Sequence, residues 1–129
     1  MIDHMGIAVS DIARSRTFYE AALGALGMAV EMEVTPDQTE SGGTALGFGV
    51  PGESIFWIGD GERPGEGTHV AFKADTRAQV DAFHAAAIAA GGKDNGAPGP
   101  RLHYGPNYYA AFVYDPDEAN IEAVCYAEA

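Results

Sequence analysis

The chain has 129 residues, 47% of them hydrophobic, which suffices for one domain with a real core but not for two independent ones. Nineteen acidic and seven basic residues give a formal charge of −12, so nucleic acid and anionic membranes are poor partners, whereas a metal ion or a cationic small molecule is favoured. The single cysteine cannot form a disulfide within the chain, and no apolar run is long enough to span a membrane. Because the N-terminus also lacks the pattern of a signal peptide, we expect a cytoplasmic protein.

The first half of the chain reads as a strand, a helix and three further strands. Apolar side chains alternate with others over residues 3–9, as in a strand with one buried face. Met5, Ile7 and Val9 are expected on the face under the helix, and His4 on the opposite face. Asp11 has the position of a helix N-cap, and the helical spacing ends near Gly24. Turn residues then separate three strands predicted at residues 28–35, 44–50 and 54–59.

The second half follows the same plan after a linker at residues 62–67 that is rich in glycine and charge. Its first strand places Val70 and the alternate positions beyond it under a helix, and His69 on the opposite face. Thr76, with Gln79 three residues later, has the pattern of a capping box that starts this helix. Residues 91–106 are predicted to form a loop, and residues 108–114 and 119–126 to form two strands.

Shifting the sequence by 65 residues aligns its two halves without a gap. His4 then meets His69, and Trp57 meets Glu122. Proline, phenylalanine and glycine positions match as well, so two copies of one strand-helix-strand-strand-strand unit are the simplest account. Chance similarity between segments rich in alanine and glycine is the alternative.

A single carboxylate stands out on the last predicted strand. Because side chains alternate along a strand, Glu122 shares one face with Asn120 and Val124, while Ile121 and Cys125 face the helix. Cys125 is therefore expected to be a packed thiol and not a nucleophile. Glu122 is the first candidate for chemistry on this strand.

Short motifs over essentially the whole chain carry a resemblance to a known family. They are, in chain order, His4, Phe18-Tyr19, Leu23-Gly24, His69, Asp115-Pro116-Asp117 and Ile121-Glu122. With these residues the chain resembles the vicinal oxygen chelate superfamily, which includes glyoxalase I, extradiol dioxygenases, fosfomycin-resistance enzymes and bleomycin-binding proteins. The resemblance implies one α+β domain, residues 1–129, built from two βαβββ modules at residues 1–61 and 68–129. Glu118 is a departure, because the family usually has glycine in this turn.

The resemblance implies one divalent metal ion per site, iron, manganese, nickel or zinc, with His4, His69 and Glu122 as its ligands. Two imidazoles and one carboxylate leave about three coordination positions open for substrate oxygens. The resemblance also implies a homodimer with shared sites, an arrangement in which His4 could come either from the same chain or from the partner subunit. A hydrogen-bonded structural role is the alternative for either histidine taken alone.

Trp57 occupies the position that the repeat pairs with Glu122. In glyoxalase I-like relatives with four protein ligands this position is a glutamate that also moves a proton, whereas tryptophan has no lone pair to bind a metal or accept a proton. The three remaining ligands resemble the pattern of extradiol dioxygenases and fosfomycin-resistance enzymes. We expect Trp57 to line the substrate pocket, with a place in the core as the alternative.

A polar and aromatic cluster precedes the last two predicted strands. We predict catalytic roles for Arg101, His103 and Tyr104, and substrate contacts for Tyr108 and Tyr109. Such a cluster can bind an anionic oxygen and supply an acid or a base. A solvated loop with aromatic residues at an interface is the alternative.

Our leading prediction of function is a metal-dependent lyase or isomerase related to glyoxalase, which holds a small substrate through two neighbouring oxygens. A ring-cleaving dioxygenase of the extradiol type is the first alternative. The second is a metal-free protein that binds a small molecule, as bleomycin-binding relatives do, and the acidic composition suits a cationic ligand. A fosfomycin-type transferase is disfavoured by the scarcity of basic residues for a phosphonate.

Overall fold

The fold consists of two βαβββ modules, as predicted, and the computed structural model describes residues 1–128. The first module contains β1 (Met5–Ala8), α1 (Ile12–Gly24), β2 (Ala29–Val34), a short 3-10 helix (Pro36–Gln38), β3 (Ala45–Val50) and β4 (Glu53–Gly59). The second contains β5 (His69–Lys73), α2 (Arg77–Ala89), β6 (Lys93–Pro100), β7 (Tyr109–Tyr114) and β8 (Asn120–Cys125). Neither α-helix within residues 1–128 has the length and hydropathy needed to cross a membrane.

Each module forms a four-stranded sheet, and the two sheets share one plan. The strand orders are β1-β4-β3-β2 and β5-β8-β7-β6, with a parallel pair followed by antiparallel ones. Gly6 pairs with Trp57 in the first sheet, and 65 residues later Ala71 pairs with Glu122 in the second. Trp57 and Glu122 therefore occupy equivalent places, and the internal repeat is confirmed at the level of strand register.

Strand β6 corrects the sequence analysis, which predicted a loop over residues 91–106. Strand β6 itself, residues 93–100, contains two prolines and two glycines, and its pairing with β7 shifts register on both sides of Gly96. A strand can tolerate such residues at the edge of a sheet, where one side of its backbone makes no ladder hydrogen bonds. The composition of β6 thus indicates an irregular edge strand and not the absence of a strand.

Both helices begin at the predicted caps. Asp11 accepts a hydrogen bond from the backbone N–H of Arg14 at 3.0 Å, and the Thr76 hydroxyl accepts one from Gln79 at 3.1 Å. These side chains satisfy N–H groups that the first helical turn leaves without an intrahelical partner. The cap positions therefore fix where each helix starts relative to the strand before it.

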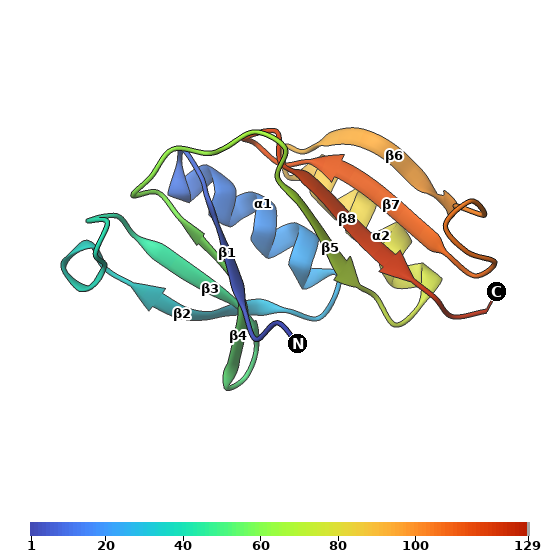
Figure 1. Cartoon of the computed structure of the whole chain (residues 1–129), viewed down its shortest axis with the longest axis horizontal. Coiled ribbons are helices and arrows are strands. Elements are labelled where there is room, and N and C mark those ends of the chain that lie inside the picture. Colours follow the sequence, from blue (N-terminus) through green and yellow to red (C-terminus); the bar gives the residue numbers. More distant parts are fainter. Residues whose placement is uncertain (129) are drawn as a thin grey trace.

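The helices cover one face of each sheet, and both modules contribute to a single core (Figure 1). Val70, Phe72 and Ala74 are buried on the helix side, as are Ile121, Ala123 and Cys125, in agreement with the predicted alternation. The rings of Phe56 and Phe72 meet edge to face across the two modules, with centroids 5.1 Å apart. Side-chain packing in this core therefore holds the two sheets together, since no strand of one sheet pairs with a strand of the other.

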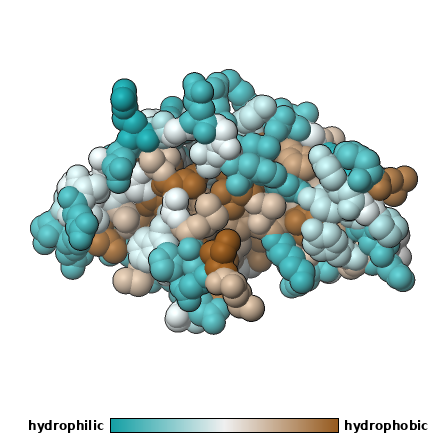
Figure 2. Space-filling view, viewed as in Figure 1, coloured by the Kyte–Doolittle hydropathy of each residue, from teal (hydrophilic) through white to brown (hydrophobic). Residues whose placement is uncertain are grey.

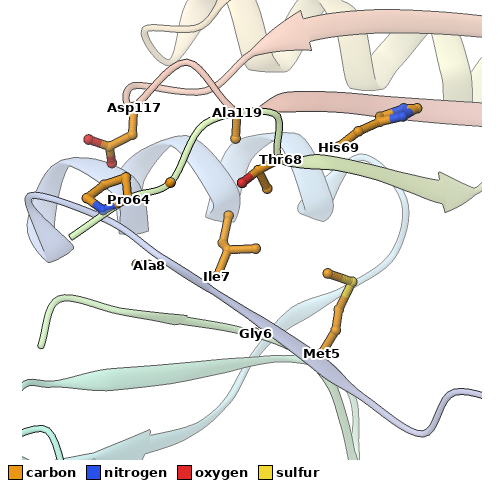
Figure 3. Close-up of a pocket in the computed structure, with 10 residues that line it drawn as sticks. Met5, Gly6, Ile7, Ala8, Pro64, Thr68, His69, Asp117 and Ala119 are labelled. Atoms are coloured by element: carbon orange, nitrogen blue, oxygen red, sulfur yellow. The ribbon is translucent and has the colours of Figure 1, made fainter. Parts of the chain in front are cut away.

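Strand β1 departs from the prediction that its apolar face lies under α1. Val9 is fully buried and Ile7 half-buried, but Met5 is 36% exposed. A cavity of about 380 Å³ lies between β1 and β5, and Met5 and Ile7 line it with Thr68 (Figure 3). The prediction therefore holds for Val9, which is in the core, and fails for Met5, because the start of β1 faces the cavity beside the second module.

The two modules are tied together where α1 meets the turn before β8. The Tyr19 hydroxyl donates to Asp115 at 2.5 Å, and Asp115 also accepts from the backbone N–H groups of Asp117 and Ala119 at 2.8 and 2.9 Å. The N–H of Ser10 donates to the Asp117 carboxylate at 3.0 Å. Burial raises the pKa of Tyr19 well above its ordinary value, and the Asp115 carboxylate raises it further.

The turn itself contains the departure noted in the sequence. Glu118 has a φ of +68°, a left-handed conformation that glycine adopts at lower cost than other residues. Its N–H donates to the carbonyl of Asp115 at 2.9 Å, and the N–H of Asp115 donates to the carbonyl of Ala119 at 2.9 Å. The closed turn therefore tolerates a glutamate where the resemblance led us to expect glycine.

Replacing Tyr19 by phenylalanine should lower the free energy of unfolding at pH 7 by about 1–3 kcal/mol, because the buried Asp115 carboxylate loses a donor but keeps its desolvation cost. Urea titration measures the change. Tyr114→Phe, at an exposed ring, is the matched control and should stay within about 0.5 kcal/mol of the wild type.

The same variant tests an alkaline pH dependence. Since the pKa of Tyr19 is raised in the folded state, the native protein keeps this proton at a pH where the unfolded chain has lost it. The stabilising contribution is complete below about pH 10 and falls by about 1.4 kcal/mol per pH unit above it. Tyr19→Phe should lack this part of the slope, and an unchanged slope would contradict the assignment.

Candidate functional site

The face of each sheet that no helix covers is called here its open face. In Figure 1 both helices lie behind the strands, so the view is onto the two open faces. Figure 2 shows apolar residues gathered over the middle of this view, with mostly hydrophilic residues around them. The predicted site residues are distributed between the two open faces, with one exception.

A buried carboxylate lies on the open face of the second sheet. Glu122 is only 2% exposed, although it belongs to the face of β8 opposite the core. Its Oε1 lies 2.9 Å from His69 Nε2, and its Oε2 accepts a hydrogen bond from the Tyr108 hydroxyl. His69 opens β5, which pairs in parallel with β8, so the two strands bring these side chains together. The structure thus joins two of the three predicted metal ligands.

Tyr108, predicted to contact substrate, holds the carboxylate in place. Burial raises the pKa of the Tyr108 phenol, and the hydrogen bond to Glu122 raises it further. The phenol therefore remains a neutral donor well beyond neutral pH. Both oxygens of Glu122 have partners from the chain itself, which fixes the carboxylate orientation.

Phe112 and Arg101 extend this open face away from Glu122. Phe112 is the cross-strand partner of Glu122 on β7, and its ring centroid lies 6.3 Å from that of His69. The guanidinium carbon of Arg101 lies 5.4 Å from the centre of the same ring. The sequence analysis did not identify Phe112, although the 65-residue offset from Gly47, which pairs with Trp57, would have indicated it.

His103 and Tyr104 lie at the rim of the second sheet and do not contact Glu122. Their rings are 4.1 Å apart, and the Tyr104 ring is 5.2 Å from that of Tyr108. Tyr104 is 63% exposed. The two residues therefore form one end of an aromatic row that continues through Tyr108 to Tyr126, whose ring centroid lies 5.3 Å from that of Tyr108.

Tyr109 is the exception, because it lies on the helix-covered face of the second sheet. Its hydroxyl donates to Asp81 on α2 at 2.6 Å, and the Arg77 guanidinium lies 4.8 Å from its ring centre. Side chains of adjacent residues in an extended chain point to opposite faces, so Tyr108 and Tyr109 cannot line the same pocket. The structure does not bring Tyr109 together with the other candidates.

His4 and Trp57 lie on the open face of the first sheet. They line a shallow hollow of about 1040 Å³, together with apolar Met32 and Ile55 and acidic Glu31. His4 is largely exposed, and its Nδ1 lies 2.7 Å from Asp3. Trp57 is half-buried, outside the core cluster, so its indole is a wall of this hollow.

The three predicted ligands are not assembled within one chain. Over residues 1–128, no three His, Cys, Asp or Glu side chains meet as a metal-binding group. His4 belongs to the hollow of the first sheet, whereas His69 lines the separate cavity between β1 and β5, with its ring directed away from β1 (Figure 3). Within one chain the three candidate ligands are therefore divided between two places, called here candidate half-sites.

The half-site of the second module fits a divalent ion in part. An imidazole nitrogen and a carboxylate oxygen 2.9 Å apart are two donors of the kind that iron, manganese, nickel and zinc accept. Among residues 1–128, no lysine or arginine forms a salt bridge with Glu122. A third donor would have to come from outside this face.

The chain is similar to members of one known family. The family model described as Glyoxalase/Bleomycin resistance protein/Dioxygenase superfamily matches residues 1–123. A glyoxalase/bleomycin resistance protein from Albidiferax ferrireducens T118 is 32% identical in sequence, its crystal structure superposes with a TM-score of 0.75, and the alignment covers 97% of this chain and 98% of that one. Comparison with curated proteins gives no match.

Two more distant structures share the fold. An enzyme of the glyoxalase/bleomycin resistance protein/dioxygenase family from Burkholderia phytofirmans PsJN is 21% identical, with a TM-score of 0.68 and coverage of 97% of this chain and 98% of that one. Glyoxalase I from Zea mays is 22% identical, also with a TM-score of 0.68, over 95% of this chain and 43% of that one. At these identities the likeness establishes the fold alone.

The contact between Tyr108 and Glu122 predicts that the Tyr108 phenol loses its proton at a higher pH than an ordinary tyrosine. In ¹³C-tyrosine NMR, the signal that Tyr108→Phe removes should stay in its protonated position as the pH passes 10. Glu122→Gln should bring that titration closer to pH 10, because the neutral amide removes the negative charge beside the phenol. Glu118→Gln, the same change in an exposed turn, should leave it unaltered; a shift of equal size there would contradict the pairing.

Proposed function

The chain belongs to the glyoxalase/bleomycin resistance protein/dioxygenase superfamily, and on that premise we propose that it is a metal-dependent lyase or isomerase of the glyoxalase type. The observation that carries this proposal is the buried Glu122 carboxylate, which adjoins His69 on an open sheet face in a chain of charge −12. A buried carboxylate is costly unless a cation or hydrogen bonds offset its charge. A divalent ion at this position would supply that charge.

In the proposed site, the ion is held by His69 and Glu122 of one subunit and by His4 of the partner subunit. The ion is iron, manganese, nickel or zinc. When bound, it acts as a Lewis acid that polarises two neighbouring oxygens of a small substrate. Tyr108 keeps the Glu122 carboxylate oriented toward this position through its hydrogen bond.

The internal repeat supports the proposal of a homodimer with shared sites. Trp57 has the same place in the first sheet as Glu122 in the second, and His4 precedes β1 as His69 opens β5. If a twofold axis set the open face of the first module against the second module of a partner, each pair of faces would enclose one complete site. Exposed Met32 and Ile55, on the rim of the hollow in the first module, would then be covered.

Trp57, His103 and Arg101 would have separate roles at this site. Trp57 provides an apolar wall that excludes water, but it cannot take a proton from the substrate. We therefore assign proton transfer to His103 at the rim, next to Tyr104, because imidazole can both accept and donate a proton. Arg101 adds positive charge on the same open face.

Ring-cleaving dioxygenase chemistry is a second candidate, favoured by Trp57. With tryptophan in place of a fourth carboxylate, the proposed ligand set contains two histidines and one glutamate, an arrangement used by iron oxygenases. The metal in the purified protein separates the two functions. Iron together with turnover of catechols in air supports the dioxygenase, and nickel, zinc or manganese supports the lyase or isomerase.

A metal-free binding protein is the third candidate, favoured by the hydrogen bonds of Glu122. Both of its oxygens already have partners, His69 and Tyr108, without a metal. The hollow beside Trp57 has acidic Glu31 and Glu53 at its rim, which suits a cationic ligand. Absence of bound metal after gentle purification and reloading would support this candidate.

Replacing Glu122 by glutamine tests the ligand assignment. Added divalent metal should raise the melting temperature of the wild type by mass action, and this increment should largely vanish in Glu122→Gln because the carboxylate charge is lost. Stability without metal should change by less than about 1 kcal/mol. Glu118→Gln should respond to metal as the wild type does. Equal metal binding by Glu122→Gln and the wild type would contradict the proposal.

Mixed dimers test whether the sites are shared. His4→Ala and Glu122→Ala should each abolish metal binding in their homodimers. After unfolding and refolding of an equal mixture, each heterodimer should contain one intact site and one doubly altered site, so about one quarter of the wild-type metal binding should return. A stable, metal-loaded monomer in sedimentation experiments, or no recovery in the mixture, would overturn the shared site.

A further inference from the structure

Arg101 sits in a slot that the chain builds around it. Its Nη1 donates to the carbonyl of Gly99 and its Nη2 to that of Ala97, both at 2.8 Å, while the guanidinium lies over the Phe112 ring. A Cβ added to Gly96 would come within 3.1 Å of Arg101 Nη2 and of Phe112 Cδ1, and one added to Gly99 within 3.4 Å of Nη1. The glycines of β6 therefore leave the space that the guanidinium fills.

This guanidinium is fixed in position but has unused donors. Arginine carries five N–H groups, and two of the nitrogens of Arg101 are engaged by carbonyl oxygens of its own segment. In the described part of the chain, no carboxylate forms a salt bridge with Arg101, whereas Arg14 and Arg16 on α1 pair with acidic side chains. Arg101 is thus an ordered cation on an open face whose charge is not matched by an acidic side chain in the described residues.

Arg101 is placed to share a ligand with the Glu122 half-site. Phe112 contacts the Arg101 guanidinium and the His69 ring, and its backbone pairs with Glu122. One small molecule beside Phe112, between Arg101 and His69, can therefore reach both side chains. The negative charge of Glu122 would repel an anion bound here, and the positive charge of Arg101 offsets that repulsion.

We propose that Arg101 binds a carboxylate of the substrate, so that the substrate is a small organic monocarboxylate. The proposal rests on the proposed function for the location of the substrate on this open face. A planar guanidinium matches a carboxylate through two parallel hydrogen bonds, and its fixed position lowers the entropy lost on binding. A phosphate dianion fits less well, because a single arginine would face two negative charges beside Glu122.

Salicylate and salicylamide are suitable probes, since they share a ring and a neighbouring hydroxyl and differ in the carboxylate. Calorimetric titration of the metal-free dimeric protein compares them, so the result does not depend on metal binding. The wild type should bind salicylate about 10-fold or more tightly than salicylamide. Arg101→Met should remove this preference, and Arg101→Lys should keep part of it, because lysine retains the charge but not the planar pair of donors.

Arg16→Met is the matched control, because it changes the net charge equally but lies on α1, where Arg16 pairs with Glu20 and Glu33. It should leave the preference for salicylate unchanged. Equal binding of the two probes by the wild type would overturn the proposal without affecting the metal assignment. The proposal would also be overturned if Arg101→Met had a lower melting temperature but kept the preference for salicylate. Arg101 would then only stabilise the conformation of β6. If Arg101→Met does not fold, Arg101→Lys and the wild-type comparison decide.

Discussion

The hydrogen bond between Tyr19 and Asp115 connects the parts on which the site depends. Tyr19 belongs to the helix of the first module, and Asp115 closes the turn from which β8 starts. Through this contact the packing of α1 sets the position of β8, and with it the position of Glu122. The two open faces are consequently held in a fixed relation, although no backbone ladder joins the sheets.

The sequence predicted most of the fold, because strand alternation and helix caps are local signals. The sides assigned to Val70, Ile121 and Cys125 are those found in the structure. Both errors involve edge strands. Prolines and glycines in β6 suggested a loop, although an edge strand tolerates them, and Met5 on β1 was placed under a helix because alternation shows which side chains share a face but not what covers that face.

For the candidate site, the repeat was more informative than any single motif. It linked Trp57 to Glu122 before the registers were known, and the structure pairs His69 with Glu122 on one face. Tyr109 was included because sequence proximity was used where alternation should have excluded it. The surroundings of Arg101 could not be predicted, because they depend on the irregular register of β6 with β7.

The irregularity of β6 also bears on how the molecule avoids aggregation. A regular outer strand offers unpaired N–H and C=O groups to any other chain, and β2 and β6 are the outermost strands of the two sheets. Proline and the register shifts break that row of groups in β6, while Glu31 and Glu33 place charge along β2. The inner edges, β1 and β5, lie on either side of the central cavity. The prolines and glycines that made β6 hard to recognise as a strand therefore also protect this sheet edge from pairing with another chain.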